Sequence, residues 1–307
     1  MADKLFCRLL AVPLSLMLFL VGCKAQPDFR VALQQEQEEA SVPRSGVPVP
    51  PIKTWLCYYD DRQGPEEYSR FDLVVLDGHH HPPLVRTSGD HPLFLGYLSV
   101  GEVDVTGPLW SAARGQPFIV QYDEFWDSWI VDVRDPAWQQ LVYEDADAIL
   151  SQGFDGLFLD TIDSSLSLLE GDEKLTYQGT VEALQHILNS LRTKHPGKYI
   201  AINRGLDALP SLAPLIDIVV IEDLYSYYPD DEQGYIKVDR QARDLLLSQA
   251  EEGVRINPNL TILTLDYADS DQVDLAREAI DFSRAKGFIP YVSTIELDQI
   301  FNHTLHY

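Results

Sequence analysis

The segment Gly153-Phe154-Asp155-Gly156-Leu157-Phe158-Leu159-Asp160-Thr161-Ile162-Asp163 decides how the rest of the chain is interpreted. Its apolar run, residues 157–159, ends at the carboxylate of Asp160, and a second carboxylate follows at Asp163. Gly153 stands where a preceding helix would end, because glycine readily adopts the backbone conformation that closes a helix. The pattern predicts a helix that leads into a buried strand with an acidic side chain at its carboxyl end.

Eight apolar runs in all have the length of buried strands, and helical patterns separate several of them. These runs are Trp55–Tyr59, Leu73–Leu76, Leu93–Leu98, Gly156–Asp160, Tyr199–Asn203, Ile218–Glu222, Ile262–Asp266 and Phe288–Val292. Eight strands alternating with helices predict a (β/α)8 TIM barrel, whose functional residues lie at the carboxyl ends of the strands. An open doubly wound sheet is the alternative, although no glycine-rich phosphate loop follows the first strand. Residues 126–133 are expected to form an insertion after the third strand.

Three helices have recognisable boundaries. Asp135 can cap a helix whose first position is Pro136, and apolar residues recur at helical spacing up to Gly153. Residues 180–192 repeat that spacing. Asp269, with Gln272 three residues later, predicts the start of another helix, and Gly287 its end before the last strand.

The N-terminus has the features of a bacterial lipoprotein signal. Lys4 and Arg8 precede the apolar run of residues 9–22, which has the length of a signal-peptide core. The run ends in Leu20-Val21-Gly22-Cys23, which resembles a lipobox, the motif whose cysteine receives lipid. Cys23 is therefore expected to anchor the chain to a membrane of the bacterial cell envelope, on its periplasmic or extracellular face. Ordinary signal cleavage and an uncleaved anchor are the alternatives.

The segment after the signal is too polar to form a core. Residues 23–50 are rich in Gln and Glu and end in a proline-rich stretch, so they are expected to form a flexible tether. The predicted organisation is a signal at 1–22, a tether at 23–50 and one catalytic barrel at 51–307. Of the 3 cysteines, Cys7 and Cys23 belong to the signal region, and Cys57 is expected to be a buried, inert thiol.

The composition is strongly acidic. The chain has 48 acidic and 23 basic residues, for a net charge of -25. Such a surface excludes nucleic acid as an expected partner, because nucleic-acid binding requires basic patches. It favours a cationic ligand, although a soluble, self-repelling surface is the simpler interpretation.

Acidic side chains gather at the predicted carboxyl ends of the strands. Asp160 and Glu222 each end a strongly apolar strand and would be held rigidly at the barrel rim. Glycoside hydrolysis usually requires two carboxyl groups, one ionised and one protonated, on either side of the scissile bond. The spacing therefore makes Asp160 and Glu222 the candidate catalytic pair; the alternative is that they bond backbone groups or Arg204.

These motifs resemble glycoside hydrolase family 114, the endo-α-1,4-polygalactosaminidase-like TIM barrels. The resemblance extends from about Trp55 to about Val292 and rests on Phe154–Asp163, the run Tyr97-Leu98-Ser99-Val100-Gly101-Glu102, Asn203, and Ile221-Glu222-Asp223. It implies a retaining glycosidase that needs no cofactor, with Asp160 as nucleophile and Glu222 as acid/base. The neighbours of both acids depart from the family's Glu-Pro-Asp-Asn and Asn-Glu-Gln patterns, so the chain resembles a divergent branch.

Further residues at the same face are candidates for substrate binding. They are Tyr58, Tyr97, Glu102, Asp163, Asn203, Tyr225, Asp266 and Tyr291. The tyrosines could stack on sugar rings or simply pack, while Trp126 and Trp129 could wall a cleft. A cationic galactosamine polymer would suit an acidic barrel mouth.

His79-His80-His81 could suggest a metal site, but three adjacent histidines cannot all face one ion, and Pro82-Pro83 marks a loop. No metal is therefore expected. Two other functions remain open: a carbohydrate-binding barrel without catalysis, and a different barrel hydrolase that uses Asp160 with Asp163 or Glu102.

Overall fold

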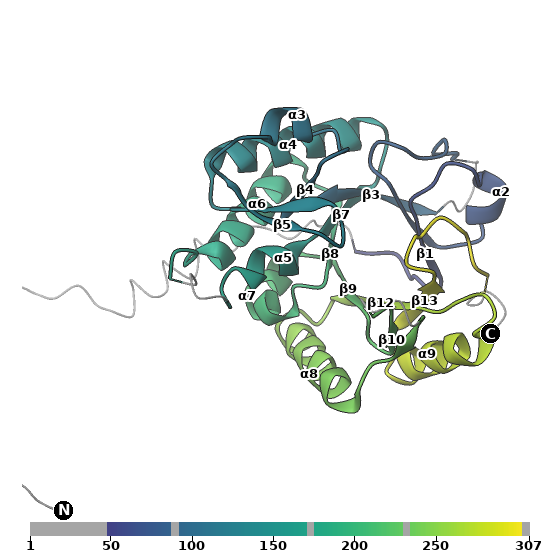
Figure 1. Cartoon of the computed structure of the whole chain (residues 1–307). Coiled ribbons are helices and arrows are strands. Elements are labelled where there is room, and N and C mark those ends of the chain that lie inside the picture. Colours follow the sequence, from purple (N-terminus) through teal and green to yellow (C-terminus); the bar gives the residue numbers. More distant parts are fainter. Residues whose placement is uncertain (1–47, 87–91, 171–174, 230–233, 303–307) are drawn as a thin grey trace, which may run out of the picture. The chain divides into compact units, whose positions relative to one another are not determined.

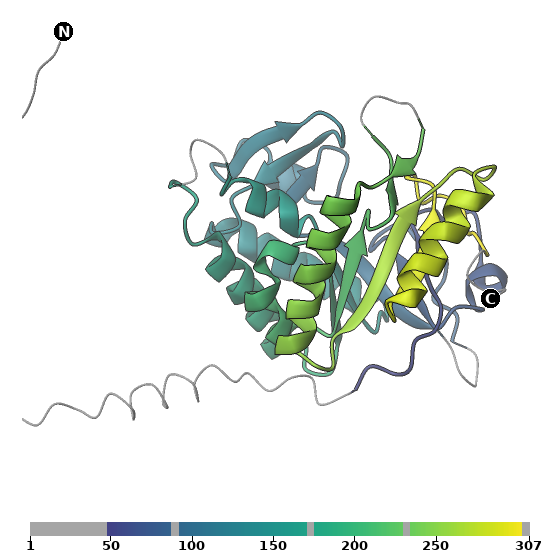
Figure 2. The same ribbon diagram turned by 90° about the horizontal axis from the view of Figure 1, so that it is seen from below.

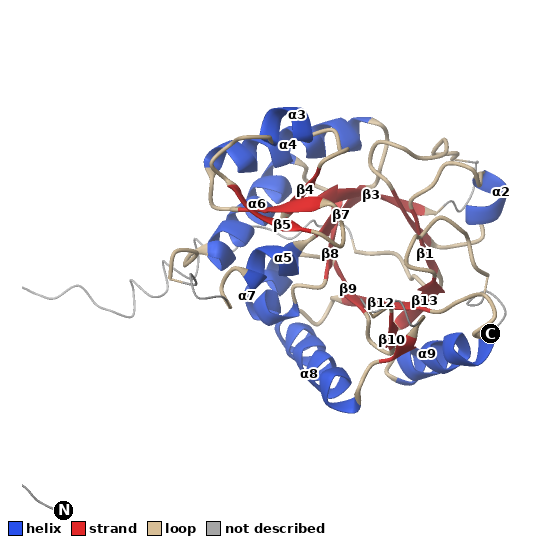
Figure 3. Cartoon of the chain, viewed as in Figure 1, coloured by secondary structure: helices blue, strands red, loops and turns tan. Residues whose placement is uncertain are grey.

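Eight parallel strands form one sheet in the order β1-β2-β3-β7-β8-β9-β12-β13. In the computed structural model, which describes residues 48–86, 92–170, 175–229 and 234–302, they form a ring with helices around it (Figures 1 and 3). The strands are β1 (Trp55–Tyr58), β2 (Leu73–Leu76), β3 (Leu93–Ser99), β7 (Gly156–Asp160), β8 (Tyr199–Asn203), β9 (Ile218–Glu222), β12 (Thr261–Tyr267) and β13 (Ile289–Ser293). The predicted (β/α)8 barrel is confirmed, and the doubly wound sheet is wrong.

Side-chain contacts and one backbone hydrogen bond close the barrel between its first strand and the segment that includes and follows its last strand. No backbone ladder joins β1 to β13 in the part of the chain that the structure describes. Instead, the indole Nε1 of Trp55 donates to the carbonyl of Ile289 at 3.0 Å, and the rings of Trp55 and Tyr291 meet edge to face at 5.8 Å. Near the mouth, Tyr59 N donates to the carbonyl of Leu297 at 2.8 Å.

Helix α4 (Pro136–Ser151) leads into β7 as predicted. The Asp135 carboxylate accepts from Ala137 N at 2.7 Å, Pro136 occupies the first turn, and Gly153 has φ +107° after the helix. The remaining helices are α2 (Pro65–Tyr68), α3 (Trp110–Ala113), α5 (Ile162–Ser167), α6 (Thr180–Lys194), α7 (Leu209–Leu212), α8 (Arg240–Ile256) and α9 (Val273–Ala285), with 3-10 turns η1 (Leu206–Ala208) and η2 (Ala213–Leu215).

The start of α9 differs from the prediction. Asp269 was expected to begin the helix, but α9 begins at Val273 and Gln272 is its N-cap. The backbone N of Asp269 donates to Gln272 Oε1 at 3.0 Å, and Gln272 N donates to the carbonyl of Asp269 at 2.9 Å. The two residues therefore close a turn in front of the helix. The side-chain bond expected of a capping box is present, but the backbone of residues 269–272 is not helical.

The insertion after β3 forms a small antiparallel sheet in the order β4-β6-β5. Its strands are β4 (Glu102–Asp104), β5 (Ile119–Asp123) and β6 (Ser128–Val131), and a second hairpin pairs β10 (Ser226–Tyr227) with β11 (Ile236–Lys237). Figure 2 shows these additions at the end of the barrel to which the strand arrows point. They follow β3 and β9, so they extend the walls of the barrel mouth.

The lipoprotein signal at 1–22, Cys23 and most of the tether lie outside the described residues. The last tether residues contact the barrel: Tyr199 OH donates to the carbonyl of Pro48 at 3.3 Å, and Val49 packs against the core. Within the described ranges, no helix is long and apolar enough to cross a membrane.

Candidate active site

The ends of β7, β8 and β9 share an unusual backbone. Asp160, Asn203 and Glu222 are the last residues of these adjacent strands. The residue after each has a left-handed backbone: φ is 61° at Thr161, 55° at Arg204 and 57° at Asp223. Non-glycine residues adopt this conformation at a cost of roughly 1 kcal/mol or more, and they concentrate at functional sites. Three side chains are thus held at one rim by three strained turns.

Residues 99–102 hold the turn after Asp160. Thr161 Oγ1 accepts from Gly101 N at 2.7 Å, contacts Ser99 Oγ at 2.9 Å and donates to the carbonyl of Asp160 at 2.6 Å. Val100 N donates to the same carbonyl at 3.0 Å. A Cβ on Gly101 would lie 2.0 Å from the carbonyl oxygen of Thr161, so only glycine allows this close approach. The Ser-Val-Gly motif therefore fixes the backbone that carries Asp160.

Asn203 joins the two candidate catalytic acids. Its Nδ2 donates to Asp160 Oδ1 at 2.9 Å and to Glu222 Oε2 at 2.6 Å. Because both bonds begin at one nitrogen, the two carboxylate oxygens lie no farther apart than the sum of these lengths, 5.5 Å. Tyr267 OH donates to the other oxygen of Glu222 at 2.5 Å. Two carboxyl groups from different strands thus share one donor.

The pKa of Asp160 is strongly raised. Burial, and next the negative charge of Glu222, raise the pKa of Asp160 to about 7, and the hydrogen bond from Asn203 opposes this rise only in part. A carboxyl group that holds its proton near neutral pH can act as a general acid. Asp160 can therefore hold a proton at the site in the neutral range.

This shift predicts a pH-dependent gain in stability for the Asp160→Asn variant. Between pH 4 and 7 the unfolded chain releases the Asp160 proton and the folded chain retains it, so the stability of the wild type falls as pH rises. Asparagine removes that penalty and still accepts from Asn203. We expect the melting temperature of the variant, relative to wild type, to rise from pH 4 to 7 and then level off.

Thermal unfolding across this pH range is the measurement. Glu278→Gln is the control, because Lys237 lowers the pKa of the exposed Glu278, so the sign of its pH effect is opposite. A constant difference between Asp160→Asn and wild type at every pH would contradict the burial argument.

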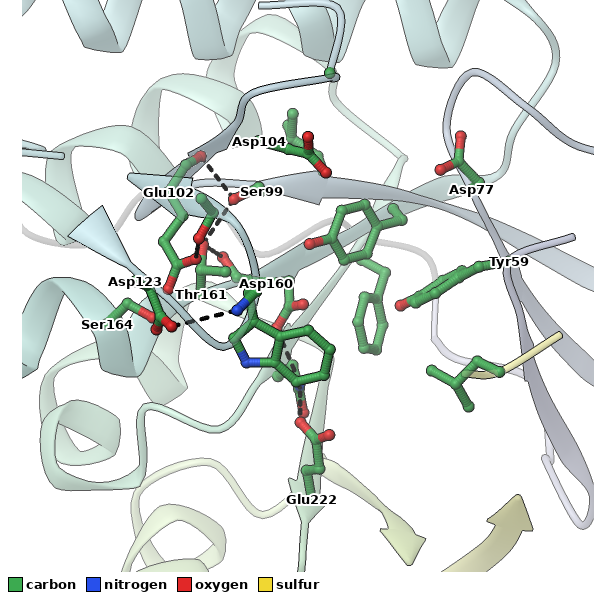
Figure 4. A pocket seen from close by; sticks show the side chains of 18 of the residues that line it. Tyr59, Asp77, Ser99, Glu102, Asp104, Asp123, Asp160, Thr161, Ser164 and Glu222 are labelled. Carbon is green, nitrogen blue, oxygen red and sulfur yellow. Dashed lines mark hydrogen bonds between the residues drawn. The ribbon is translucent and has the colours of Figure 1, made fainter. Parts of the chain in front are cut away.

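The acids open into a cleft of about 1300 Å³ at the barrel mouth (Figure 4). Its acidic lining residues are Asp77, Glu102, Asp104, Asp123, Asp145, Asp160, Asp163, Glu222, Asp223 and Glu296. Arg204 is the only lysine or arginine among the described residues that line it. Since Arg204 pairs with Asp163 at 2.8 Å and with Asp223 at 2.9 Å, it leaves most of this negative charge uncompensated. The cleft therefore favours a cation.

Six of the residues predicted for the site line this cleft: Tyr97, Glu102, Asp160, Asp163, Asn203 and Glu222. Tyr97 packs edge to face on Tyr59 at 5.0 Å and lies above Phe158. Glu102 is 6% exposed and accepts from Ser128 Oγ, and burial raises its pKa. Asp163 forms an ion pair with Arg204, and its negative charge also contributes to the raised pKa of Asp160.

The structure does not bring the other four, Tyr58, Tyr225, Asp266 and Tyr291, to the cleft lining. Tyr58 OH accepts from Gln63 N, and Tyr291 is buried against Trp55. Tyr225 packs on Phe282 and donates to Glu278. Asp266 accepts from the backbone N of Tyr225 and Ser226, so it fixes the turn after β9.

At two places the sequence prediction selected the residue next to the one that lines the cleft. Tyr59 and Tyr267 line the cleft, whereas their neighbours Tyr58 and Asp266 were selected. Successive side chains of a strand point to opposite faces, so a shift of one residue exchanges the barrel interior for the exterior. The face on which Glu222 lies could not be carried over to Tyr59 and Tyr267, because they belong to other strands. The sequence does not give the register between strands.

The side chains of His79 and His81 have separate partners. His79 Nε2 lies 2.8 Å from Asp145 Oδ1, while the two ring nitrogens of His81 contact the carbonyl of Pro82 and Gln152 Oε1. In the described ranges, no group of three or more His, Cys, Asp or Glu side chains could hold a metal ion.

Comparison with known sequences finds one matching family. The model of glycoside-hydrolase family GH114 matches residues 34–306. A protein of Deinococcus radiodurans is 28% identical over 245 residues, which cover 76% of each chain. Protein MJ1477 of Methanocaldococcus jannaschii is 25% identical over 262 residues, covering 76% of this chain and 73% of that protein.

Two solved structures share the fold. The glycoside hydrolase domain of PelA from Pseudomonas aeruginosa superposes with a TM-score of 0.71 at 29% identity, covering 81% of this chain and 98% of that domain. Aspergillus fumigatus Ega3, determined in complex with galactosamine, superposes with a TM-score of 0.60 at 14% identity, covering 81% of this chain and 94% of Ega3.

Proposed function

Since the chain belongs to glycoside hydrolase family GH114, we propose that it cleaves a polysaccharide containing amino sugars, similar to polygalactosamine, with Asp160 and Glu222 as its catalytic acids. The observation that carries the proposal is the bridge of Asn203 between these two carboxyl groups, at the floor of an acidic cleft. A barrel that only bound sugar would not need this close pair of carboxyl groups.

The separation of the acids supports a retaining mechanism. Retaining glycosidases place their carboxyl groups about 5–5.5 Å apart, whereas inverting enzymes need roughly 6.5–9.5 Å to admit a water. The two oxygens that accept from Asn203 lie within 5.5 Å of each other, which agrees with the first class. In this scheme Asp160 attacks the anomeric carbon while Glu222 gives its proton to the leaving oxygen. Glu222 then takes a proton from the water that hydrolyses the glycosyl ester on Asp160.

The proton must reach Glu222 before the attack. The raised pKa of Asp160 favours a proton on that residue, the opposite of the reactive arrangement. Asn203 donates to both carboxyl groups and so holds them close to each other. The reactive form is the one in which the single proton of the pair resides on Glu222. If the proton instead stays on Asp160, where burial favours it, Asp160 is the acid and Glu222 the nucleophile.

The charge of the cleft supports an amino-sugar substrate. A protonated sugar amine would be attracted by the uncompensated carboxylates, which raises the local substrate concentration. The galactosamine bound to Ega3, a protein of the same fold, agrees with this choice.

The test is a panel of partly deacetylated galactosamine and glucosamine polymers, incubated with the purified chain and analysed for new reducing ends. We expect cleavage of a polymer with free amines and slower cleavage after full N-acetylation. Tight binding of a polymer without cleavage would instead establish the carbohydrate-binding alternative.

We also propose that Cys23 carries lipid and holds the barrel at the bacterial cell envelope, with residues 1–22 as the signal and 23–50 as the tether. The sequence Leu20-Val21-Gly22-Cys23 supports this. Release of the Cys23→Ser variant from the membrane fraction is the expected result, and its retention there would refute lipidation.

A further inference from the structure

The turn between β5 and β6 is held by its own aspartates. Asp123 Oδ1 accepts from the backbone N of Phe125 at 2.9 Å and of Trp126 at 3.3 Å. Asp127 has φ 50°, and its Oδ1 accepts from Tyr122 OH at 2.5 Å. These bonds fix the backbone that presents Phe125 and Trp126.

Both rings are unusually exposed. Phe125 is 48% and Trp126 is 53% accessible, and with Tyr122 they are the only aromatic residues among the exposed large hydrophobic side chains of the described ranges. Their rings meet edge to face at 4.8 Å. Large apolar side chains gain free energy from burial, so neighbouring exposed aromatics indicate a surface that a ligand covers.

Phe125, Trp126 and Asp123 all line the cleft. Figure 4 shows the labelled Asp123 beside Glu102 and Ser164, on one side of Asp160. The small sheet is tied to the catalytic turn, since Val131 N donates to the carbonyl of Gly101 at 2.9 Å and Ser128 Oγ donates to Glu102. The turn thus has a fixed place relative to Asp160.

We propose that Phe125, Trp126 and Asp123 form a subsite for an amino-sugar unit of the polymer outside the position that is cleaved. The aromatic faces cover the apolar C–H surface of the sugar, and they attract its ammonium group as a cation. The Asp123 carboxylate adds opposite charge. The inference rests on the proposed function, because it takes its ligand from that function.

Trp126→Ala is the first test. We expect the KM for polymer to rise roughly ten-fold, in the range of cation–π and aromatic contacts, and the ratio of variant to wild-type KM to grow with chain length. Leu245→Ala is the control, since it removes a large exposed apolar side chain that lies outside the cleft lining and on a different element, helix α8. Equal KM changes in the two variants, or a Trp126→Ala ratio independent of chain length, would overturn the subsite.

A binding measurement separates this subsite from the cleavage reaction. Tryptophan fluorescence of Glu222→Gln is titrated with galactosamine oligomers and compared with that of Glu222→Gln/Trp126→Phe. A spectral change lost with Trp126 supports the subsite even if no polymer is cleaved. An unchanged titration in the double variant refutes the subsite, while cleavage by the wild type would leave the proposed function standing.

Discussion

Glu222→Gln and Asp160→Asn will each lower the rate of polysaccharide cleavage by roughly a thousand-fold or more, because in the proposed mechanism both groups act directly on the glycosidic bond. Both replacements keep the side-chain shape and leave an oxygen that can accept from Asn203. Reducing-end assays on purified variants measure the loss. Glu278→Gln, an acid that bonds Tyr225 and lies off the cleft lining, should retain wild-type activity.

The roles of the two acids can be separated by rescue. In Asp160→Ala, azide can replace the nucleophile and would give a glycosyl azide of inverted configuration. In Glu222→Ala, azide would attack the glycosyl ester on Asp160 and give the retained product. The opposite pattern would assign the nucleophile to Glu222 and the acid to Asp160, in agreement with the raised pKa of Asp160. Full activity of Asp160→Asn would remove it from the chemistry.

Gly101→Ala will destabilise the fold and abolish activity together. The new Cβ would lie 2.0 Å from the carbonyl oxygen of Thr161 and 2.4 Å from Ser165 Oγ, distances that real Cβ contacts do not reach. We expect a loss of about 3 kcal/mol, since overpacking typically costs that much or less and here the neighbour is backbone. The melting temperature would fall by roughly 10 °C. Activity would fall because the displaced turn carries Asp160, and a shift of about 1 Å can cost 100-fold.

Gly64→Ala provides the comparison for calorimetry and activity. Gly64 has φ −109°, and the nearest atom to an added Cβ there is Glu67 Oε2, at 4.0 Å. This variant should therefore unfold near the wild-type temperature. If Gly101→Ala were equally stable and active, the packing of residues 99–102 on the Thr161 turn would not be what positions Asp160.

The strands of the barrel could be predicted because each is a short apolar run between polar or glycine residues. Each predicted strand boundary agrees with the observed one to within one residue, as in β7 and β9. The small sheet after β3 could not be predicted as a sheet, because β4 has three residues and β5 lies half-exposed. Its three strands are stabilised by contacts with one another and with the barrel rim.

The candidate site was predictable only where a residue ends its strand. Asp160, Asn203 and Glu222 each occupy the last strand position, so their place at the mouth follows from topology. The tyrosines were ambiguous because Tyr58 and Tyr59 are equally aromatic, and only the turn geometry decides which ring enters the barrel. The bridge from Asn203 to both acids requires the inter-strand register, in which Asn203 lies opposite Val220.

The left-handed residues Thr161, Arg204 and Asp223 limit how far this barrel can be stabilised without losing its chemistry. Glycine at any of them would relax the backbone. However, Thr161 supplies the hydroxyl that holds Gly101, and Arg204 and Asp223 form an ion pair in the cleft wall. Thermostabilising substitutions should therefore be sought elsewhere, because a glycine at these positions would remove the contacts that hold the cleft wall and the turn after Asp160.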